Sequence, residues 1–308
     1  MSRWPPRPRL SASFYKAHGL GNDYLVFEEG DDWTATPENV QRVCHRTMGV
    51  GSDGIVVLLG SEPTPEGEDG YAGPPAVRLR MFNPDGGEFE RSGNGLRVLA
   101  SYLMRADADV RDIDVEVGGS SVRMVGHGRV GCVYDVSVDM GRASTGLEAV
   151  LMDPGVLGED GRLIGPSGDG LRVVPVSVGN PHVVVVCEDE SELTEERLAE
   201  VGPFLAEHPA LAHGTNVQLA LADGNGRCRA LIWERGVGRT SASGTSACAV
   251  GVALVSSGVL RAGDVEVRMP GGVLHVRVTD ELDVVLRGPV EEVLVGRLSC
   301  EAWLADHR

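Results

Sequence analysis

Apolar residues recur along the chain in short runs, either unbroken or alternating with polar residues, and this pattern is typical of β-strands. The runs are rich in valine, whose branched side chain fits a pleated surface. The pattern predicts two strands joined by a glycine-rich turn within Phe14–Phe27, and further strands at Ile55–Leu59, Val77–Phe82, several positions up to about Met140, Val173–Val178, Val183–Cys187, Leu231–Glu234, Val265–Met269, Val273–Val278 and Val284–Leu286.

Four segments instead show the three-to-four-residue spacing or the length of helices. They are Pro37–Met48, Ser92–Arg105, Thr194–His208 and Thr245–Ser257. Thr194 is the expected N-cap of the third helix. We expect Met1–Ala12 to form a disordered tail, and Ser61–Pro75, which is rich in proline, glycine and acidic residues, to form an exposed loop.

A short internal repeat relates the two halves of the chain. Ser92-Gly93-Asn94 precedes one predicted helix, and Ser243-Gly244-Thr245 precedes another about half a chain later. Gly21-Asn22-Asp23 and Gly179-Asn180-Pro181-His182 repeat in a compatible register. Together the two echoes predict duplicated halves that face each other across a cleft. Such a cleft suits chemistry that needs matched groups on opposite faces of one atom.

The composition is that of a globular protein and narrows the classes of partner. Of the 308 residues, 42% are hydrophobic and 5% are aromatic, and this length favours two domains. The net charge of −17 argues against a nucleic-acid partner, because phosphate binding needs clustered Lys and Arg. We find no apolar run long enough to span a bilayer and no signal-peptide core, so we expect a cytoplasmic protein without a membrane contact.

The six cysteines do not form a metal-binding motif. No two have CxxC spacing, so the sequence predicts no zinc site. We expect reduced and mostly buried thiols with structural roles. They are Cys44, Cys132, Cys187, Cys228, Cys248 and Cys300.

The two Ser-Gly turns are the strongest candidates for chemistry. Serine is a good helix N-cap, so each serine has a structural explanation. A helix N-terminus also offers free backbone N–H groups and the positive end of the helix dipole. Two such ends acting together would hold a carboxylate and stabilise negative charge developing on it if an α-proton were removed.

Beyond these turns, the sequence resembles the diaminopimelate epimerase family in several blocks that follow the family order from about residue 14 to 290. The set of blocks is specific, whereas any one of them is weak. The blocks are Phe14–Asp23, Gly49–Gly54, Phe82–Gly86, Ser92–Arg97, Gly179–His182, Thr215–Val217, Trp233–Gly238, Ser243–Ala249 and Pro270–Gly272.

The resemblance implies an α/β (α+β) fold of two pseudo-symmetric domains, each a curled sheet or barrel around a central helix. It places an N-terminal half-domain at residues 1–139, completed by about 288–308, and a C-terminal half-domain at 140–287. It implies a cofactor-independent isomerase of lysine biosynthesis, without pyridoxal phosphate or metal. It also implies a homodimer that binds a small amino-acid substrate between the two domains.

The resemblance assigns roles to individual residues. The family's two catalytic cysteines fall at Ser92 and Ser243, supported by His182 and Glu234 respectively. The residues implied to contact the distal end of the substrate are Asn22, Asn83, Asn180, Asn216, Glu234 and Arg235. The residues implied to contact the α-carboxylate are Gly93, Asn94, Gly244 and Thr245.

Serine at both cysteine positions leaves several functions open. A hydroxyl is a far weaker acid than a thiol and usually needs an adjacent base, for which His182 could serve Ser92 and Glu234 could serve Ser243. The main hypothesis is an epimerase-type isomerase acting at the α-carbon of a diaminopimelate-like amino acid. The alternatives are a dehydratase or double-bond isomerase with His182 or Glu234 as base, a non-catalytic amino-acid-binding homologue, and serines engineered to trap a complex.

Overall fold

The computed structural model describes residues 6–62, 76–89, 92–117 and 119–299. The chain divides into two compact units, residues 1–138 with 289–308 (unit 1) and residues 139–288 (unit 2). It passes between the units twice, within strands β9 (Val133–Arg142) and β20 (Asp283–Arg297). In the described part of the chain, no helix has the length and apolar character needed to cross a membrane.

The strands of unit 1 close on themselves. In order around the sheet they pair as β1–β2–β4–β5–β7–β8–β9–β20, and β20 pairs with β1 again. The short strands β3 and β6 extend β1 and β5. Besides β9 and β20, the strands are β1 (Arg9–Gly19), β2 (Asn22–Glu29), β3 (Trp33–Thr34), β4 (Ile55–Glu62), β5 (Ala76–Phe82), β6 (Glu88–Phe89), β7 (Asp112–Val117) and β8 (Ser120–Val130).

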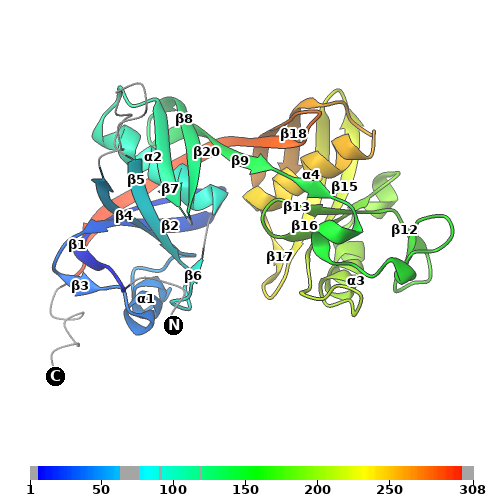
Figure 1. Ribbon diagram of the computed structural model, residues 1–308, viewed down its shortest axis with the longest axis horizontal. Coiled ribbons are helices and arrows are strands. Elements are labelled where there is room, and N and C mark those ends of the chain that lie inside the picture. The colour runs from blue at the N-terminus through cyan, green and yellow to red at the C-terminus, as the bar shows by residue number, and fades with distance from the viewer. Residues whose placement is uncertain (1–5, 63–75, 90–91, 118, 300–308) are drawn as a thin grey trace, which may run out of the picture. The chain divides into compact units, whose positions relative to one another are not determined.

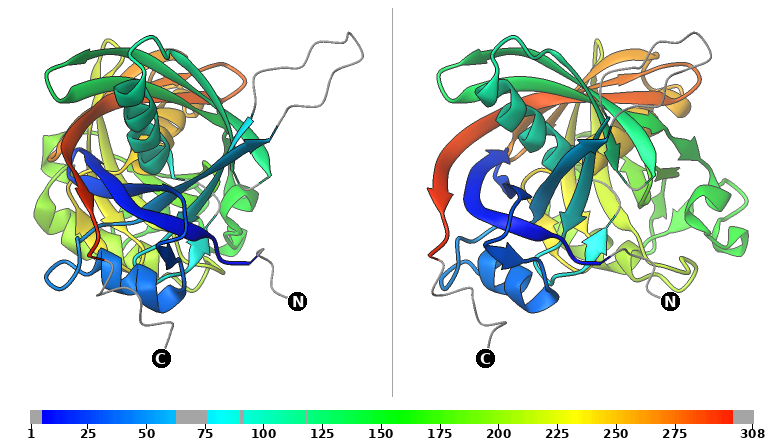
Figure 2. Two further views of the ribbon diagram at one scale, coloured as in Figure 1. Left: turned by 90° about the vertical axis from the view of Figure 1, so that its left-hand side faces the viewer. Right: turned by 60° about the vertical axis from the view of Figure 1, so that its left-hand side comes forward.

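Helix α2 (Gly93–Ala106) runs along the inside of this curled sheet and contacts β1, β2, β4 and β8, as Figure 2 shows. Its side chains are buried almost continuously from Gly93 to Ser101, which explains why the helix is apolar on more than one face. Helix α1 (Pro37–Cys44) is shorter and begins at the N-cap Thr36. The sheet and α2 therefore fix the position of the α2 N-terminus.

Unit 2 repeats the same plan. Its strands pair in the order β10–β13–β14–β15–β16–β18–β19–β20, with β17 added to β16, and β11 pairs with β12 separately. The strands are β10 (Ser144–Thr145), β11 (Leu163–Ile164), β12 (Gly170–Leu171), β13 (Val173–Ser177), β14 (Pro181–Val186), β15 (Asn216–Gly224), β16 (Arg227–Glu234), β17 (Gly238–Thr240), β18 (Gly263–Met269) and β19 (Gly272–Val278). The single-turn helices are η1 (Leu147–Val150), η2 (Pro154–Val156) and η3 (Glu190–Glu192).

Helix α4 (Gly244–Ser256) is the counterpart of α2 and contacts β13, β14, β15, β16, β18 and β19 (Figure 1). The pairing directions also repeat, because β2–β4 and β5–β7 are parallel in unit 1, as β14–β15 and β16–β18 are in unit 2. This arrangement confirms the predicted fold class of two pseudo-symmetric curled sheets, each around a central helix.

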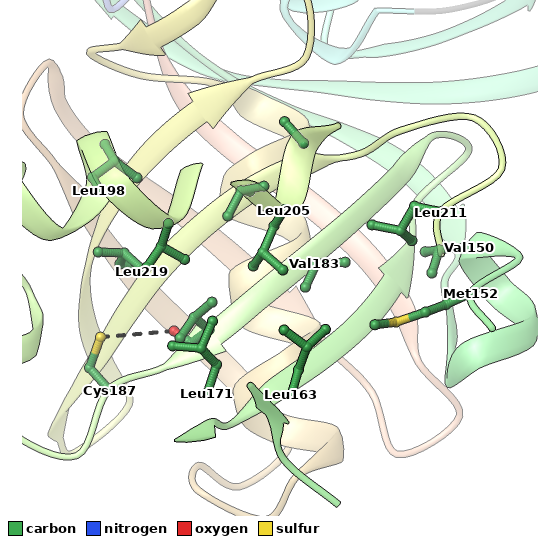
Figure 3. Close-up of a cluster of buried hydrophobic side chains, with 14 of the residues drawn as sticks. Val150, Met152, Leu163, Leu171, Val183, Cys187, Leu198, Leu205, Leu211 and Leu219 are labelled. Atoms are coloured by element: carbon green, nitrogen blue, oxygen red, sulfur yellow. Dashed lines mark hydrogen bonds between the residues drawn. The ribbon is translucent and has the colours of Figure 1, made fainter. Parts of the chain in front are cut away.

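A second hydrophobic layer covers the outer face of the unit 2 sheet. Helix α3 (Glu195–Ala206) packs on β15 and β16. Figure 3 shows Leu198 and Leu205 of α3 together with Val183 and Leu219 of the sheet. This cluster of buried side chains joins α3 to the sheet of unit 2.

Two expectations about the elements need correction. The predicted disordered tail is wrong from Arg9 onward, because Leu10 and Ala12 are buried in β1. Helix α1 ends at Cys44, since the Nδ1 atom of His45 accepts hydrogen bonds from the backbone N–H groups of Thr47 and Met48 and holds a turn there. Most of the predicted loop Ser61–Pro75 lies outside the described residues.

Candidate functional site

Ser92 is the N-cap of α2 in unit 1. Its Oγ atom accepts a hydrogen bond from the backbone N–H of Gly95 at 3.1 Å. The serine is half-buried, whereas Gly93 and Asn94 are buried in the first helical turn. The helix therefore directs its positive N-terminal end and a serine hydroxyl to the same point.

Asn22 and Asn94 are hydrogen-bonded to each other beside Ser92. The Asn94 Nδ2 atom donates to the backbone oxygen of Asn22 at 2.6 Å and to its Oδ1 atom at 2.8 Å. The Asn94 Oδ1 atom accepts from Arg97 at 2.9 Å. Gly19 is required here, because a Cβ atom at this position would lie 2.1 Å from Asn94 Oδ1. The contacts leave the Asn94 amide a single orientation.

A cluster of charged side chains holds the Asn22 side chain in place. The Asn22 Nδ2 atom donates to Asp53 at 2.9 Å, and Arg46 bridges Asp53 and Asp23. Lys16 lies 2.9 Å from Asp23. Burial alone would raise the pKa of Asp23, but the bonds from Arg46 and Lys16 outweigh it and hold that pKa below its usual value. Asp23 is therefore ionised at neutral pH.

Asn83 lies on the tight turn between β5 and β6 of unit 1. Its backbone N–H donates to Gly87 at 2.8 Å, and its carbonyl oxygen accepts from Gly86 at 2.9 Å. Gly86 has a φ of 81°, which only glycine adopts easily. The side chain of Asn83 is exposed and available to a ligand.

Ser243 is the N-cap of α4 and occupies the position in unit 2 that Ser92 occupies in unit 1. Its Oγ atom accepts from the backbone N–H of Ser246 at 3.4 Å and lies 3.5 Å from the Thr245 hydroxyl. Gly244 opens the helix, and no acidic residue lies in its first turn. The equivalence of the two serines is thus structural as well as sequential.

His182 lies on β14 and is completely buried. Its Nε2 atom is 3.0 Å from Asn180 Oδ1, and its Nδ1 atom is 3.0 Å from Gln218 Nε2. Burial, together with the positive charge of Arg235, lowers the pKa of His182 to about 3. The imidazole is therefore neutral at pH 7, and both of its nitrogens are engaged.

Asn216 and Arg235 meet in unit 2. The Asn216 Oδ1 atom accepts from the backbone N–H of Arg235 at 3.0 Å, and its Nδ2 atom donates to the carbonyl oxygen of Pro181 at 3.3 Å. Arg235 is exposed and donates one Nη1 hydrogen bond to the carbonyl oxygen of His213. In the described part of the chain its Nε and Nη2 atoms donate no hydrogen bond. Glu234 precedes it at the end of β16 and is half-buried.

The structure therefore groups the candidate residues into two sets. Unit 1 brings Asn22 and Asn94 into contact beside Ser92, with Asn83 on a separate turn. Unit 2 brings together Asn180 with His182, Asn216 with Arg235, and Ser243 with Thr245. Ser92 with Asn94, and Ser243 with Thr245, lie at the N-termini of the two central helices.

Some of the supporting residues were not identified from the sequence. Gln218 and Ser246 bond to each other at 3.0 Å beneath the α4 N-terminus, and Arg46 links Asp23 to Asp53. The signal available for Gln218 was a polar residue inside an apolar run, but that run was not recognised as a strand.

Most of the described cysteines are buried. Burial raises the pKa values of Cys44, Cys187 and Cys228 to about 12. Cys248 is fully buried within α4, Cys132 is exposed, and Cys300 lies outside the described residues. In the described part of the chain, no group of three or more His, Cys, Asp or Glu side chains is placed to hold a metal ion.

One protein-family model and several known proteins match most of this chain. The family model described as "Diaminopimelate epimerase" matches residues 14–146 and 174–293. A diaminopimelate epimerase from Synechococcus sp. (strain JA-2-3B'a(2-13)) is 37% identical over 88% of this chain and 91% of the relative. Another, from Desulforudis audaxviator, is 36% identical over 92% of this chain and 98% of the relative.

Solved structures share the fold at lower sequence identity. A hydroxyproline epimerase from Agrobacterium vitis has a TM-score of 0.62 and 14% identity, covering 99% of each chain. A predicted epimerase from Pseudomonas aeruginosa has a TM-score of 0.61 and 20% identity, covering 93% of this chain and 98% of the other. Given the match of the family model and the identity of the relatives along most of its length, the chain belongs to the diaminopimelate epimerase family.

Proposed function

We propose that this protein is a cofactor-independent isomerase that inverts the α-carbon of a diaminopimelate-like amino acid. One observation carries the proposal: two serines cap the central helices of two equivalent units in a chain of this family. Inversion of a carbon needs one group to remove a proton and another to deliver a proton to the opposite face. Two equivalent helix ends meet that requirement.

We assign Ser92 and Ser243 as the proton-carrying groups. In each direction the alkoxide of one serine takes the α-proton and becomes a hydroxyl, the electron pair stays on the substrate as an enolate-like carboxylate, and the hydroxyl of the other serine protonates the opposite face. That second serine is left as the alkoxide, which starts the reverse direction. The free N–H groups of Gly93, Asn94, Gly244 and Thr245 bind the α-carboxylate and stabilise its developing charge. The helix dipoles of α2 and α4 act in the same sense.

Serine makes this reaction demanding, because an alkoxide is much harder to form than a thiolate, whose parent thiol has a pKa of ~8.5. Glu234 is the proposed proton acceptor for Ser243. His182 remains one of the proposed catalytic residues. Its imidazole is buried and both ring nitrogens are hydrogen-bonded, so we assign it a positioning role as a neutral ring and not the role of a base. We therefore expect slow turnover.

The distal end of the substrate is the proposed source of specificity. Asn22, Asn83, Asn180 and Asn216 offer neutral amides, and Arg235 offers a planar cation for a carboxylate. Glu234 completes the set by accepting hydrogen bonds from an ammonium group. This combination matches an amino acid that carries a second amino-acid group at its far end.

We further propose that the protein acts as a cytoplasmic homodimer without a cofactor. The support is the family relationship. Sedimentation of the purified protein tests the dimer directly. A monomer at every concentration used for activity would contradict it.

Exchange of the α-hydrogen tests the proposed reaction. The protein is incubated with each diaminopimelate stereoisomer in D₂O, and mass spectrometry measures deuterium at the α-carbon. We expect incorporation accompanied by conversion between isomers, and its loss in Ser92→Ala and in Ser243→Ala. Thr194→Ala is the matched control, because Thr194 caps α3 by the same type of hydrogen bond outside the proposed site. Tight binding without exchange in the unchanged protein would contradict catalysis.

A further inference from the structure

A chain of buried polar side chains runs beneath the N-terminus of α4. At its centre is Gln218 on β15, whose Nε2 atom lies 3.0 Å from His182 Nδ1 and 3.0 Å from Ser246 Oγ. All three side chains are at most 1% exposed. The chain ends at the half-buried Asn180, which is 3.0 Å from His182 Nε2.

The atoms of this chain determine the direction of its hydrogen bonds. An amide nitrogen only donates, so Gln218 Nε2 donates to His182 Nδ1 and the imidazole proton resides on Nε2. That proton is donated to Asn180 Oδ1, which only accepts. Within the described residues Asn180 Nδ2 donates no hydrogen bond, so its two N–H groups are free to bind a ligand.

This arrangement is unfavourable as packing alone. The Oε1 atom of Gln218 is buried and has no hydrogen-bond partner among the described residues. An unpaired buried acceptor lowers stability, and an apolar side chain of similar shape would avoid that loss. A purely structural role therefore does not explain a glutamine at this position.

Unit 1 shows that the fold works without the polar chain. Two residues after Asn22, the counterpart of Asn180, stands Tyr24, which thus corresponds to His182. The parallel pairs Leu25–Ile55 and Val183–Val217 place Val56 at the position of Gln218.

The third position follows from the helix caps, because Gly95 and Ser246 are both the third residue after the capping serine. A Cβ atom at Gly95 would lie 3.2 Å from the Tyr24 ring and 3.3 Å from Val56. The same three positions thus meet in both units. Unit 1 fills them with an aromatic ring, a valine and a glycine, and unit 2 fills them with a hydrogen-bonded chain.

We propose that Gln218 is a positioning residue that fixes His182 in its neutral Nε2–H tautomer and thereby turns the Asn180 amide N–H groups toward an anionic group of the substrate. This inference rests on the proposed function for the identity of that group, a carboxylate at the distal end. The opposite direction of the chain, with Nδ1–H donating to Gln218, would turn the carbonyl oxygen of Asn180 outward and repel a carboxylate.

The tautomer is measured first, without substrate, by ¹⁵N NMR of the full chain with labelled histidine. We expect His182 to show a protonated Nε2 atom and an unprotonated Nδ1 atom at pH 7. In Gln218→Glu the carboxylate can only accept, so the proton should move to Nδ1. Gln218→Leu removes the bond without adding charge and should give mixed tautomers, which covers the case in which the glutamate variant does not fold.

The consequence for binding is measured by steady-state kinetics on diaminopimelate. We expect Gln218→Glu to raise KM at least tenfold, with a much smaller change in kcat, because Asn180 contacts the end of the substrate that does not react. Ser101→Ala is the matched control: it removes a buried side-chain hydrogen bond, the one to Tyr15 in unit 1, outside this polar chain, so it should keep the tautomer and leave KM within about twofold of the unchanged protein.

Two results would overturn the inference: an Nδ1–H tautomer or a charged His182 in the unchanged protein, or an inverted tautomer in Gln218→Glu with no change in KM. Failure of the proposed function looks different. In that case the unchanged protein neither converts nor exchanges diaminopimelate, while the NMR result still shows whether Gln218 controls the tautomer.

Discussion

At the scale of single residues, Arg235 illustrates how an exposed side chain is prepared for a ligand. One of its nitrogens is used by the carbonyl oxygen of His213, which fixes the plane of the guanidinium. The remaining Nε–Nη2 edge has the spacing of a carboxylate. A lysine would keep the charge and lose both the plane and the second hydrogen bond.

We therefore expect Arg235→Lys to weaken diaminopimelate binding about tenfold, which corresponds to ~1.4 kcal/mol. Titration calorimetry measures the dissociation constant. Arg239→Lys is the control, because Arg239 is also exposed on the same hairpin but pairs with Glu195 on α3. An unchanged dissociation constant for Arg235→Lys would argue against a carboxylate clamp.

His182 gives the protein a measurable sensitivity to acid. The pKa of His182 in the folded state is about 3, below the ~6.5 of an unfolded histidine. Between these two pH values the unfolded chain binds a proton at this histidine and the folded chain does not. The stability due to neutral His182 is complete above pH ~6.5 and declines as the pH falls from there toward the folded-state pKa. Denaturation at acid pH should therefore begin well above the range of ordinary carboxyl groups.

We predict that His182→Gln flattens the fall in unfolding free energy below pH ~6.5, relative to the unchanged protein. Urea unfolding at a series of pH values measures it. His275→Gln, on the exposed face of β19, is the control and should keep the original slope. If the slope survives in His182→Gln, another group is responsible for the acid sensitivity.

At the scale of elements, the sequence was most informative where periodicity and caps agree. The apolar face of α2, the Thr194 cap of α3 and the small residues of α4 gave helix boundaries close to those observed. Strand β15 was not predicted, because its apolar run, Asn216–Gly224, contains the polar residue Gln218. The run also begins within the block Thr215–Val217, which was interpreted as a binding motif. Strand β20 was predicted only at Val284–Leu286, because Gly288 and Pro289 interrupt the valine pattern before the strand continues to Arg297.

The two capping serines contribute both to the stability of their helices and to the proposed proton transfer, and the two contributions can be measured separately. Ser92→Ala and Ser243→Ala each remove an N-cap hydrogen bond, so each should lower the unfolding free energy by about 1 kcal/mol. Thr194→Ala should cost about the same. Urea unfolding measures all three. A much larger loss for either serine variant would mean that lost activity reflects unfolding and not missing chemistry.

At the scale of the whole molecule, repetition of one unit explains both what was predictable and what was not. The echoes around Asn22 and Asn180, and around Ser92 and Ser243, were sufficient to predict two similar halves. The pairing order and the parallel strand pairs repeat accordingly. The differences between the halves depend on contacts distant in sequence, such as His182 with Gln218, and single-sequence patterns do not report those contacts.

Comparing the two units distinguishes the features that the fold requires in both from the features that differ between them. Both units need a central helix with a serine cap, and both have one. Among the described residues, the polar chain from Asn180 to Ser246 belongs to unit 2, and the Arg46 cluster next to Asn22 belongs to unit 1. Each unit thus orients its asparagine by a different device on the same scaffold.

The central claim is that Ser92 and Ser243 occupy the two proton-transfer positions of a diaminopimelate-type isomerase. The most direct test is the turnover of diaminopimelate by the double variant Ser92→Cys with Ser243→Cys, beside both single variants. Thiols ionise far more readily than hydroxyls and fit nearly the same space, so we expect the double variant to gain orders of magnitude in turnover and each single variant to gain little. A double variant that folds yet is inert on every diaminopimelate stereoisomer, while the unchanged protein converts another amino acid, would contradict the account.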